Sequence, residues 1–152
     1  MIIMAVDYGD ARTGLAVCGA SELLASPFEV IHQPKANKLI EAVTAAAQEK
    51  GVQKFVVGCP FNMDASAGER AQKCAAFARK LAEHSGIPAA LWDERLTTTS
   101  AHAALNVTDT RGKKRKQVVD AVAAVMILEG YLAYRKTHTE DPVYPALQGS
   151  LD

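Results

Sequence analysis

Two apolar runs at the start of the chain, residues 2–6 and 15–17, flank a short turn rich in glycine and charge. Short apolar runs bounded by turn residues are typical of buried strands. We therefore predict a β-hairpin whose turn lies between Tyr8 and Arg12. Asp7 then stands at the end of a central strand, where a core strand has no need for a charge. This carboxylate is the first candidate ligand of a catalytic metal site.

The size and composition of the chain are those of one packed domain. It has 152 residues, of which 49% are hydrophobic, so disorder is not expected. Its 17 basic residues balance its 17 acidic ones, so overall charge gives no sign of a nucleic-acid partner. The three cysteines have no metal-binding spacing, and the start of the chain lacks the features of a signal peptide. We expect a cytoplasmic protein with reduced thiols, no zinc site and no membrane contact.

The rest of the chain alternates predicted strands and helices. Three further strands are expected at residues 28–32, 54–58 and 87–92. Helices are expected at residues 37–50 and 117–135, from the Ser66-Ala67-Gly68-Glu69 pattern to Gly86, and, as a shorter helix, from Thr97 or Thr98 to about Val107. This order predicts an α/β fold in which a five-stranded mixed sheet, three antiparallel strands plus two parallel ones, is flanked by helices. Residues 1–137 would form the domain and residues 138–152 an irregular tail.

Polar residues and glycines predict where two of these helices begin and end. Asn37 is expected to cap the first helix, and Gly51 to stop it. The pattern Ser66-x-x-Glu69 is a capping box, which predicts the start of the second helix, and Gly86 follows its end.

Three acids, Asp7, Glu94 and Asp120, stand where a fold of this kind would bring them together. Asp7 and Glu94 both follow predicted parallel strands, whose carboxyl ends share one edge of a sheet. Asp120 heads the apolar stripe of the last helix, where an unpaired charge is costly. Three converging carboxylates favour Mg²⁺ or Mn²⁺, and a pair of such ions can promote hydrolysis of a phosphodiester. We therefore predict that Asp7 bridges two ions, with Glu94 and Asp120 holding one each.

Each acid also has a plainer interpretation. Asp7 could hydrogen-bond its own turn, and Asp120 could sit favourably in the first turn of a helix. Beside Glu94, Asp93 is the more structural of the two adjacent acids, and either could pair locally with Arg95.

A basic run directly precedes the predicted helix 117–135. It contains Arg111 and then Lys113, Lys114, Arg115 and Lys116. Such runs are usually solvated loops, but beside a metal site this one would suit a phosphate backbone. Arg12 could hold a phosphate near the ions. Tyr8 and Trp92 could stack on bases, although side chains of this kind more often pack in a core.

Motifs spaced along nearly the whole chain resemble the YqgF/RuvX family. They are Asp7-Tyr8-Gly9-x-x-Arg12-x-Gly14, Gly58-x-Pro60 with Asn62-Met63-Asp64, Asp93-Glu94-Arg95-Leu96-Thr97-Thr98, and Asp120-x-x-Ala123-Ala124. The resemblance implies an RNase H-like fold related to the Holliday-junction resolvase RuvC. It also implies a cytoplasmic nuclease that matures the 5′ end of precursor 16S rRNA, with Asp7, Glu94 and Asp120 as the metal-binding acids. Thr13 departs from the family's apolar residue, and Ala65 from its frequent glycine.

Three other functions remain open from the residues. The family was earlier described as a Holliday-junction resolvase, so branched DNA is an alternative substrate. An RNA-binding module without catalysis would keep the basic run and leave the acids as remnants. An actin-like or sugar-kinase-like ATPase would use Asp7-x-Gly9 for phosphate, but it needs a second domain that this chain has no room for. The residues do not decide between a monomer and a homodimer.

Overall fold

The computed structural model describes residues 1–96 and 113–147, and the side chains of residues 1–96 and 121–147. Within these ranges five strands form one sheet in the order β3-β2-β1-β4-β5. The strands are β1 (Ile3–Asp7), β2 (Thr13–Cys18), β3 (Ala25–Ile31), β4 (Lys54–Cys59) and β5 (Ala89–Asp93).

The pairing of the strands confirms the predicted mixed sheet. β1, β2 and β3 form an antiparallel meander, whereas β1, β4 and β5 are parallel to one another. The three parallel strands therefore end at the same edge, which we call the carboxyl edge. The opposite edge, where β1 and β4 begin, is called the amino edge.

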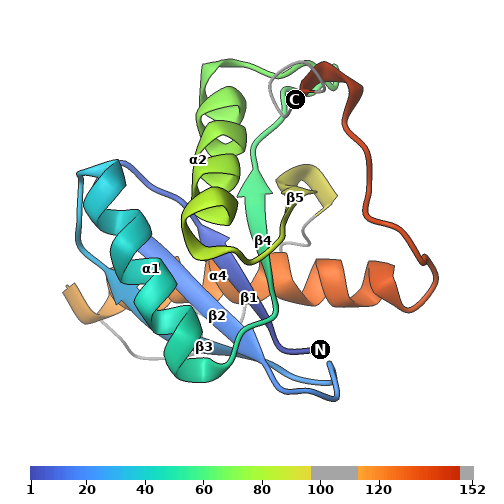
Figure 1. Cartoon of the computed structure of the whole chain (residues 1–152). Coiled ribbons are helices and arrows are strands. Elements are labelled where there is room, and N and C mark those ends of the chain that lie inside the picture. Colours follow the sequence, from blue (N-terminus) through green and yellow to red (C-terminus); the bar gives the residue numbers. More distant parts are fainter. Residues whose placement is uncertain (97–112, 148–152) are drawn as a thin grey trace.

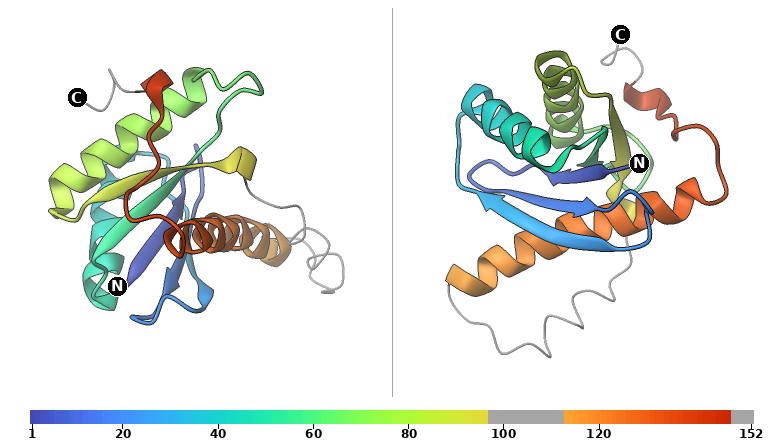
Figure 2. Two further views of the ribbon diagram at one scale, coloured as in Figure 1. Left: turned by 90° about the vertical axis from the view of Figure 1, so that its right-hand side faces the viewer. Right: turned by 60° about the horizontal axis from the view of Figure 1, so that its bottom comes forward.

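Helices cover both faces of the sheet, as Figure 1 shows. α1 (Ala36–Lys50) and α2 (Glu69–Ser85) lie on one face, and α4 (Lys113–Arg135) crosses the other. The two views in Figure 2 show these layers from the side and from below. Two short 3₁₀ turns, η1 (Glu94–Leu96) and η2 (Pro145–Leu147), complete the described elements.

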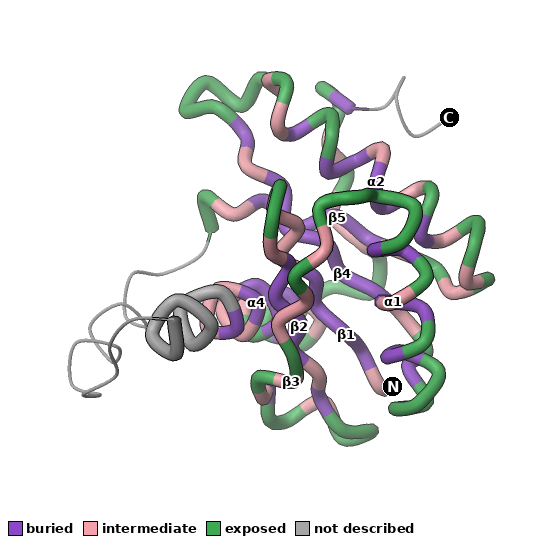
Figure 3. Tube along the Cα trace, turned by 90° about the vertical axis from the view of Figure 1, so that its left-hand side faces the viewer, coloured by how far each residue is buried: buried purple, intermediate pink, exposed green. Residues whose placement is uncertain are grey.

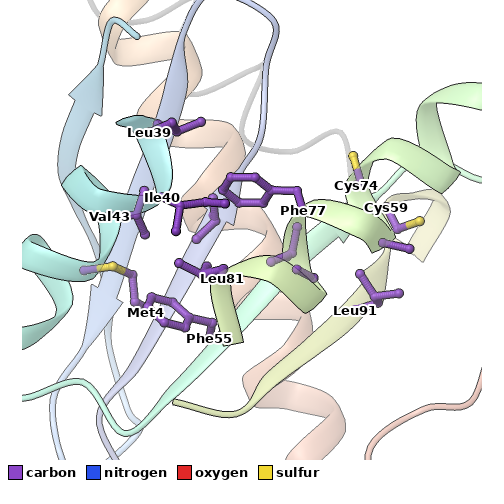
Figure 4. Close-up of a cluster of buried hydrophobic side chains, with 14 of the residues drawn as sticks. Met4, Leu39, Ile40, Val43, Phe55, Cys59, Cys74, Phe77, Leu81 and Leu91 are labelled. Atoms are coloured by element: carbon purple, nitrogen blue, oxygen red, sulfur yellow. The ribbon is translucent and has the colours of Figure 1, made fainter. Parts of the chain in front are cut away.

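β1, β2, β4 and β5 are mostly buried, whereas the edge strand β3 is partly exposed, and each face of the sheet has its own apolar core (Figure 3). Because side chains alternate along a strand, Met4 and Val6 join the core under α1 and α2, while Ile3 and Ala5 join the core under α4. Figure 4 shows part of the first core, in which Phe55 of β4 lies near Leu81 of α2. On the other face α4 contributes a helical stripe formed by Ala124, Ile127, Leu128, Tyr131 and Leu132.

The helix ends test the predicted caps. Gly51 and Gly86 adopt left-handed conformations after α1 and α2, with φ of 67° and 74°, as predicted. Both predicted N-caps are wrong. The N-cap of α1 is Lys35 and that of α2 is Gly68, and neither forms a side-chain cap hydrogen bond.

The residues predicted as caps have other positions. Asn37 lies inside the first turn of α1. Ser66 belongs to the loop before α2, where its hydroxyl donates to Asp64 and accepts a hydrogen bond from Asn62. The expected capping box is therefore replaced by a hydrogen-bonded loop.

Three other boundaries also differ from the prediction. β3 begins at Ala25 rather than at residue 28. β5 begins at Ala89 rather than at residue 87, after Pro88, which has no N–H to give to a ladder. α4 begins at Lys113 rather than at residue 117. Lys113, Lys114, Arg115 and Lys116 therefore lie in a helix and not in a loop, because lysine and arginine favour helices once Gly112 has been passed. The helix expected from Thr97 or Thr98 to Val107 falls outside the described residues.

The segment after α4 returns along the β5 side of the sheet (Figure 2). Asp141 forms an ion pair with Lys54 at the start of β4. Tyr144 accepts a hydrogen bond from the backbone N–H of Asp93 over 2.9 Å, and Leu147 is fully buried. Residues 141–147 thus pack against the domain. The proposed division of the chain at residue 137 stays a prediction.

Candidate active site

Asp7 and Glu94 reach the same face of the sheet at its carboxyl edge. Asp7 is the last residue of β1, and Ile3 and Ala5, which alternate with its neighbours, belong to the core under α4. Glu94 follows β5, two residues after Trp92 in the same core. Alternation therefore directs both carboxylates towards the α4 side.

Gly58 provides the space that Glu94 occupies. It lies near the end of β4, the strand between β1 and β5. A Cβ at this position would lie 2.7 Å from Oε1 of Glu94 and 2.5 Å from Cδ1 of Ile127. Any side chain here would therefore displace one of them. A single glycine inside an apolar strand indicates such a close approach, so this signal was available in the sequence.

The electrostatics of Glu94 show that the two acids interact. Burial, followed by repulsion from Asp7, raises the pKa of Glu94 from 4.5 to about 7, while Arg70 opposes the rise. A carboxyl group with this pKa is a candidate for function, because burial and a like charge act on it together. Two oxygen ligands that repel each other are the donor set that a hard divalent cation would relieve.

Asp93 has a structural role, as predicted for it. Its side chain is 6% exposed and forms an ion pair with Arg95, with 2.6 Å between Oδ2 and Nη2. Arg95 also donates to the backbone carbonyls of Asn62 and Met63 in the loop after β4. This ion pair connects the end of β5 to that loop. Of the two adjacent acids, Asp93 is therefore the one that pairs with Arg95, while Glu94 interacts with Asp7.

The third predicted acid cannot be placed in the same way. Asp120 belongs to α4, one helical turn before Ala124, but its side chain lies outside the described part of the structure. The same holds for the side chains of Lys113, Lys114, Arg115 and Lys116, and Arg111 lies outside altogether. Among the side chains that are described, no three acids, histidines or cysteines gather closely enough to hold a metal ion.

The residues of the first turn combine close packing with charge. A Cβ on Gly9 would lie 2.2 Å from the carbonyl oxygen of Arg12, so only glycine permits this hairpin. Thr13 is fully buried, and its hydroxyl accepts a hydrogen bond from the N–H of Gly9, which gives this departure from the family pattern a structural reason. Arg12 is half-buried beside them.

The two aromatic residues considered for base stacking pack inside the protein. Tyr8 stacks on Phe77 of α2 with 4.2 Å between ring centroids. Trp92 is 4% exposed, and Gly130 of α4 allows its ring to approach closely. The plainer interpretation of both side chains is confirmed.

Sequence reasoning missed Arg70, in the first turn of α2. Its guanidinium group pairs with Asp10, donates to the carbonyl of Tyr8 and lies 4.9 Å from the centroid of the Tyr8 ring. In the sequence it was one of several charges on an amphipathic helix. Only the contact across about sixty residues reveals it as part of the carboxyl edge.

The fold of the chain is similar to that of solved structures. The five-stranded sheet in the order β3-β2-β1-β4-β5, with helices on both faces, resembles the fold of RuvC-type resolvases. A Thermus thermophilus RuvC in complex with a Holliday junction substrate superposes with a TM-score of 0.64 at 14% identity, covering 94% of this chain and 99% of that one. Another T. thermophilus RuvC structure gives a TM-score of 0.60 at 16% identity, covering 94% and 100%.

The chain belongs to the RuvX family, described as Holliday junction resolvase, whose profile matches residues 1–134. A Lachnospira eligens protein is 42% identical over 135 residues, covering 87% of this chain and 96% of that protein. An Agrobacterium fabrum protein is 40% identical over 130 residues, covering 86% and 82%. Both carry the name "Putative pre-16S rRNA nuclease".

Proposed function

We propose that this protein is a metal-dependent nuclease that matures the 5′ end of precursor 16S rRNA in the cytoplasm. The observation that carries the proposal is the position of Glu94 against Gly58 at the carboxyl edge, where burial and the charge of Asp7 raise the pKa of Glu94 to about 7. A buried carboxyl group whose pKa is raised by a neighbouring like charge is more typical of a functional site than of a structural one. The names of the relatives support the choice of RNA. No described helix is long and apolar enough to cross a membrane.

Asp7, Glu94 and Asp120 are the residues proposed to hold Mg²⁺ or Mn²⁺. The charge of Asp7 acts on Glu94, and carboxylate oxygens such as theirs fit a hard cation. Asp120 is two helical turns before Ile127, whose side chain reaches Gly58 beside Glu94, so the helical repeat supports Asp120 as the third. Bound ions of this kind would polarise the phosphodiester and activate water.

The rest of the site would position the nucleic acid. Arg12 and the basic residues at the start of α4, Lys113, Lys114, Arg115 and Lys116, are proposed to contact phosphates. These four residues begin the α4 helix. We extend the proposal to precursor rRNA as substrate, and the RuvX description keeps branched DNA as a second candidate.

A cleavage assay with both substrates tests the proposal. Labelled precursor 16S rRNA and a four-way DNA junction are incubated with Mg²⁺, with Mn²⁺ or with EDTA. We expect metal-dependent cleavage of the RNA by the wild type and none by Asp7→Asn, which should still bind the RNA. Glu83→Gln, an exposed change on α2, should cleave normally and is the matched control.

The other outcomes decide against the proposal in different ways. Undiminished Mg²⁺-dependent cleavage by Asp7→Asn would remove Asp7 from the site. RNA binding without cleavage under any metal would identify a binding module. Cleavage of the junction alone would make DNA the substrate, and thermal stabilisation by ATP would support the ATPase alternative.

A further inference from the structure

One half of the Arg70 guanidinium group is anchored to the residue that follows Asp7. Its Nη2 donates to the carbonyl oxygen of Tyr8, and its plane lies near the Tyr8 ring. That ring is itself fixed by stacking on Phe77, with an interplanar angle of 8°. Arginine in such a place is held by both a hydrogen bond and a cation–π contact.

The other half of the guanidinium group has a partner that could be exchanged. Nη1 lies 2.8 Å from Oδ1 of Asp10, whose side chain is 86% exposed, whereas that of Arg70 is 34% exposed. An ion pair with so exposed a carboxylate contributes little to stability. Replacing Asp10 with another anion would therefore cost little and would leave the contacts with Tyr8 in place.

Arg70 is also within electrostatic reach of the paired acids. Its charge lowers the pKa of Glu94, against the effects of burial, Asp7 and Asp93. Burial raises the pKa of the Cys74 thiol to about 11; Arg70 acts against the rise, while Glu94, Asp7 and Asp10 add to it. Cys74 lies one turn after Arg70 on α2, so the charges of Arg70, Glu94, Asp7 and Asp10 all act on the same part of the carboxyl edge.

We propose that Arg70 binds a phosphate of the nucleic acid, and that Asp10 occupies this position on its guanidinium group in the free protein. The proposal rests on the proposed function, because it makes Arg70 part of the same substrate site. With Nη2 kept on the carbonyl of Tyr8, Nη1 can donate to a phosphate oxygen in place of the Asp10 carboxylate. The exchange of Asp10 for phosphate would bring the backbone of the substrate beside Asp7 and Glu94.

Binding measured without metal separates this proposal from catalysis. The affinity of the full chain for a labelled precursor RNA is measured in EDTA by fluorescence anisotropy over a range of salt concentrations. Arg70→Gln should weaken binding about tenfold and reduce the salt dependence by about one phosphate contact. Arg70→Lys should keep the salt dependence but lose part of the affinity, since lysine has no fork.

Asp10→Asn gives the opposite expectation and makes the test specific. Because it releases the guanidinium group, it should strengthen RNA binding. Lys80→Gln and Glu83→Gln change the net charge by the same amounts on exposed positions of α2 and serve as matched controls. Melting temperatures show which variants are folded.

Three results would overturn the proposal. They are an absence of RNA binding by the wild type at any salt concentration, a folded Arg70→Gln that binds like Lys80→Gln, and an Asp10→Asn that binds no better than Glu83→Gln. Should Arg70→Gln fail to fold, Asp10→Asn still decides. Absence of cleavage would count against the nuclease function and leave these binding results unchanged.

Discussion

The pKa values of carboxyl groups shift in opposite directions at the two edges of the sheet. At the amino edge, a hydrogen bond from Arg135 lowers the pKa of Glu22. Burial would raise the pKa of Asp141, but hydrogen bonds from Lys54 and Tyr131 outweigh it and lower the pKa. At the carboxyl edge, burial and Asp7 raise the pKa of Glu94 to about 7.

The charges at the amino edge stabilise the fold, whereas the charges at the carboxyl edge are kept together by the rest of the fold. The ion pairs of the amino edge connect the segment after α4 to β4, and the end of α4 to the β2–β3 turn. The acids at the carboxyl edge oppose folding in the absence of a cation, so the rest of the domain must impose their approach. Such a cost is typical of functional sites.

The largest effect is expected at Gly58, where an added side chain would displace Glu94 directly. In Gly58→Ala the new Cβ would meet Ile127 at 2.5 Å and Glu94 at 2.7 Å. Overpacking of this kind should destabilise the protein by about 1–3 kcal/mol in urea unfolding. It should also weaken Mn²⁺ binding measured by calorimetry, because Glu94 is displaced.

Gly19→Ala is the matched control for this substitution. A Cβ at Gly19 would have nothing within 4 Å, so stability and Mn²⁺ binding should both stay close to those of the wild type. Normal Mn²⁺ affinity in a folded Gly58→Ala would show that the position of Glu94 does not matter for the metal.

A smaller loss is expected when the amino edge is broken. Lys54→Gln leaves Asp141 without its ion pair, but the Asp141 side chain is 38% exposed, so solvent compensates in part. We expect a loss of about 1–2 kcal/mol with RNA cleavage unchanged. A double-mutant cycle with Asp141→Asn in urea unfolding measures the coupling, and a coupling energy near zero would make this pair irrelevant to stability.

The strands and the sheet could be predicted because their signals are local. Apolar runs ended by Asp7 and Glu94 located the parallel strands, and Gly51 and Gly86 located two helix ends. The helix starts were less predictable, since neither α1 nor α2 uses a side-chain cap. Lys113 was placed in a loop because its charge was considered and its helix propensity was not.

The candidate site was predictable only in part. The shared direction of the parallel strands predicted that Asp7 and Glu94 lie at one edge, but the position of Glu94 depends on Gly58 in a third strand. The roles of Arg70 and Tyr144 depend on contacts with residues about fifty to sixty positions away, which no local pattern contains.

A third test measures the stability that the metal-free protein loses through the repulsion between Asp7 and Glu94. Between its ordinary pKa of 4.5 and about 7, Glu94 holds a proton in the folded chain that the unfolded chain has lost. Its contribution to the stability of the metal-free protein therefore falls as pH rises through this range. Asp7→Asn removes the like charge, so the pKa of Glu94 should fall towards its ordinary value.

In EDTA, Asp7→Asn should therefore raise the free energy of unfolding over that of the wild type more at pH 8 than at pH 5. The difference should be about 1 kcal/mol or less, since one pKa unit is about 1.4 kcal/mol. Added Mg²⁺ should reverse the order, because it stabilises the wild type more. Urea unfolding at the two pH values measures this. An equal effect at pH 5 and pH 8 would show that the two carboxylates do not interact.

The smallest effect is expected in the loop after β4, at the departure from the family's glycine. Ala65 has a φ of 70°, a left-handed conformation that disfavours any residue with a Cβ. Ala65→Gly relieves this strain but makes the unfolded chain more flexible, so the net gain should be about 0.5 kcal/mol. Ala20→Gly, at an exposed turn residue without positive φ, should instead lower stability. Because Arg95 joins this loop to Asp93, the expected gain in stability arises at the carboxyl edge. A loss of stability in Ala65→Gly would show that the loop is not strained.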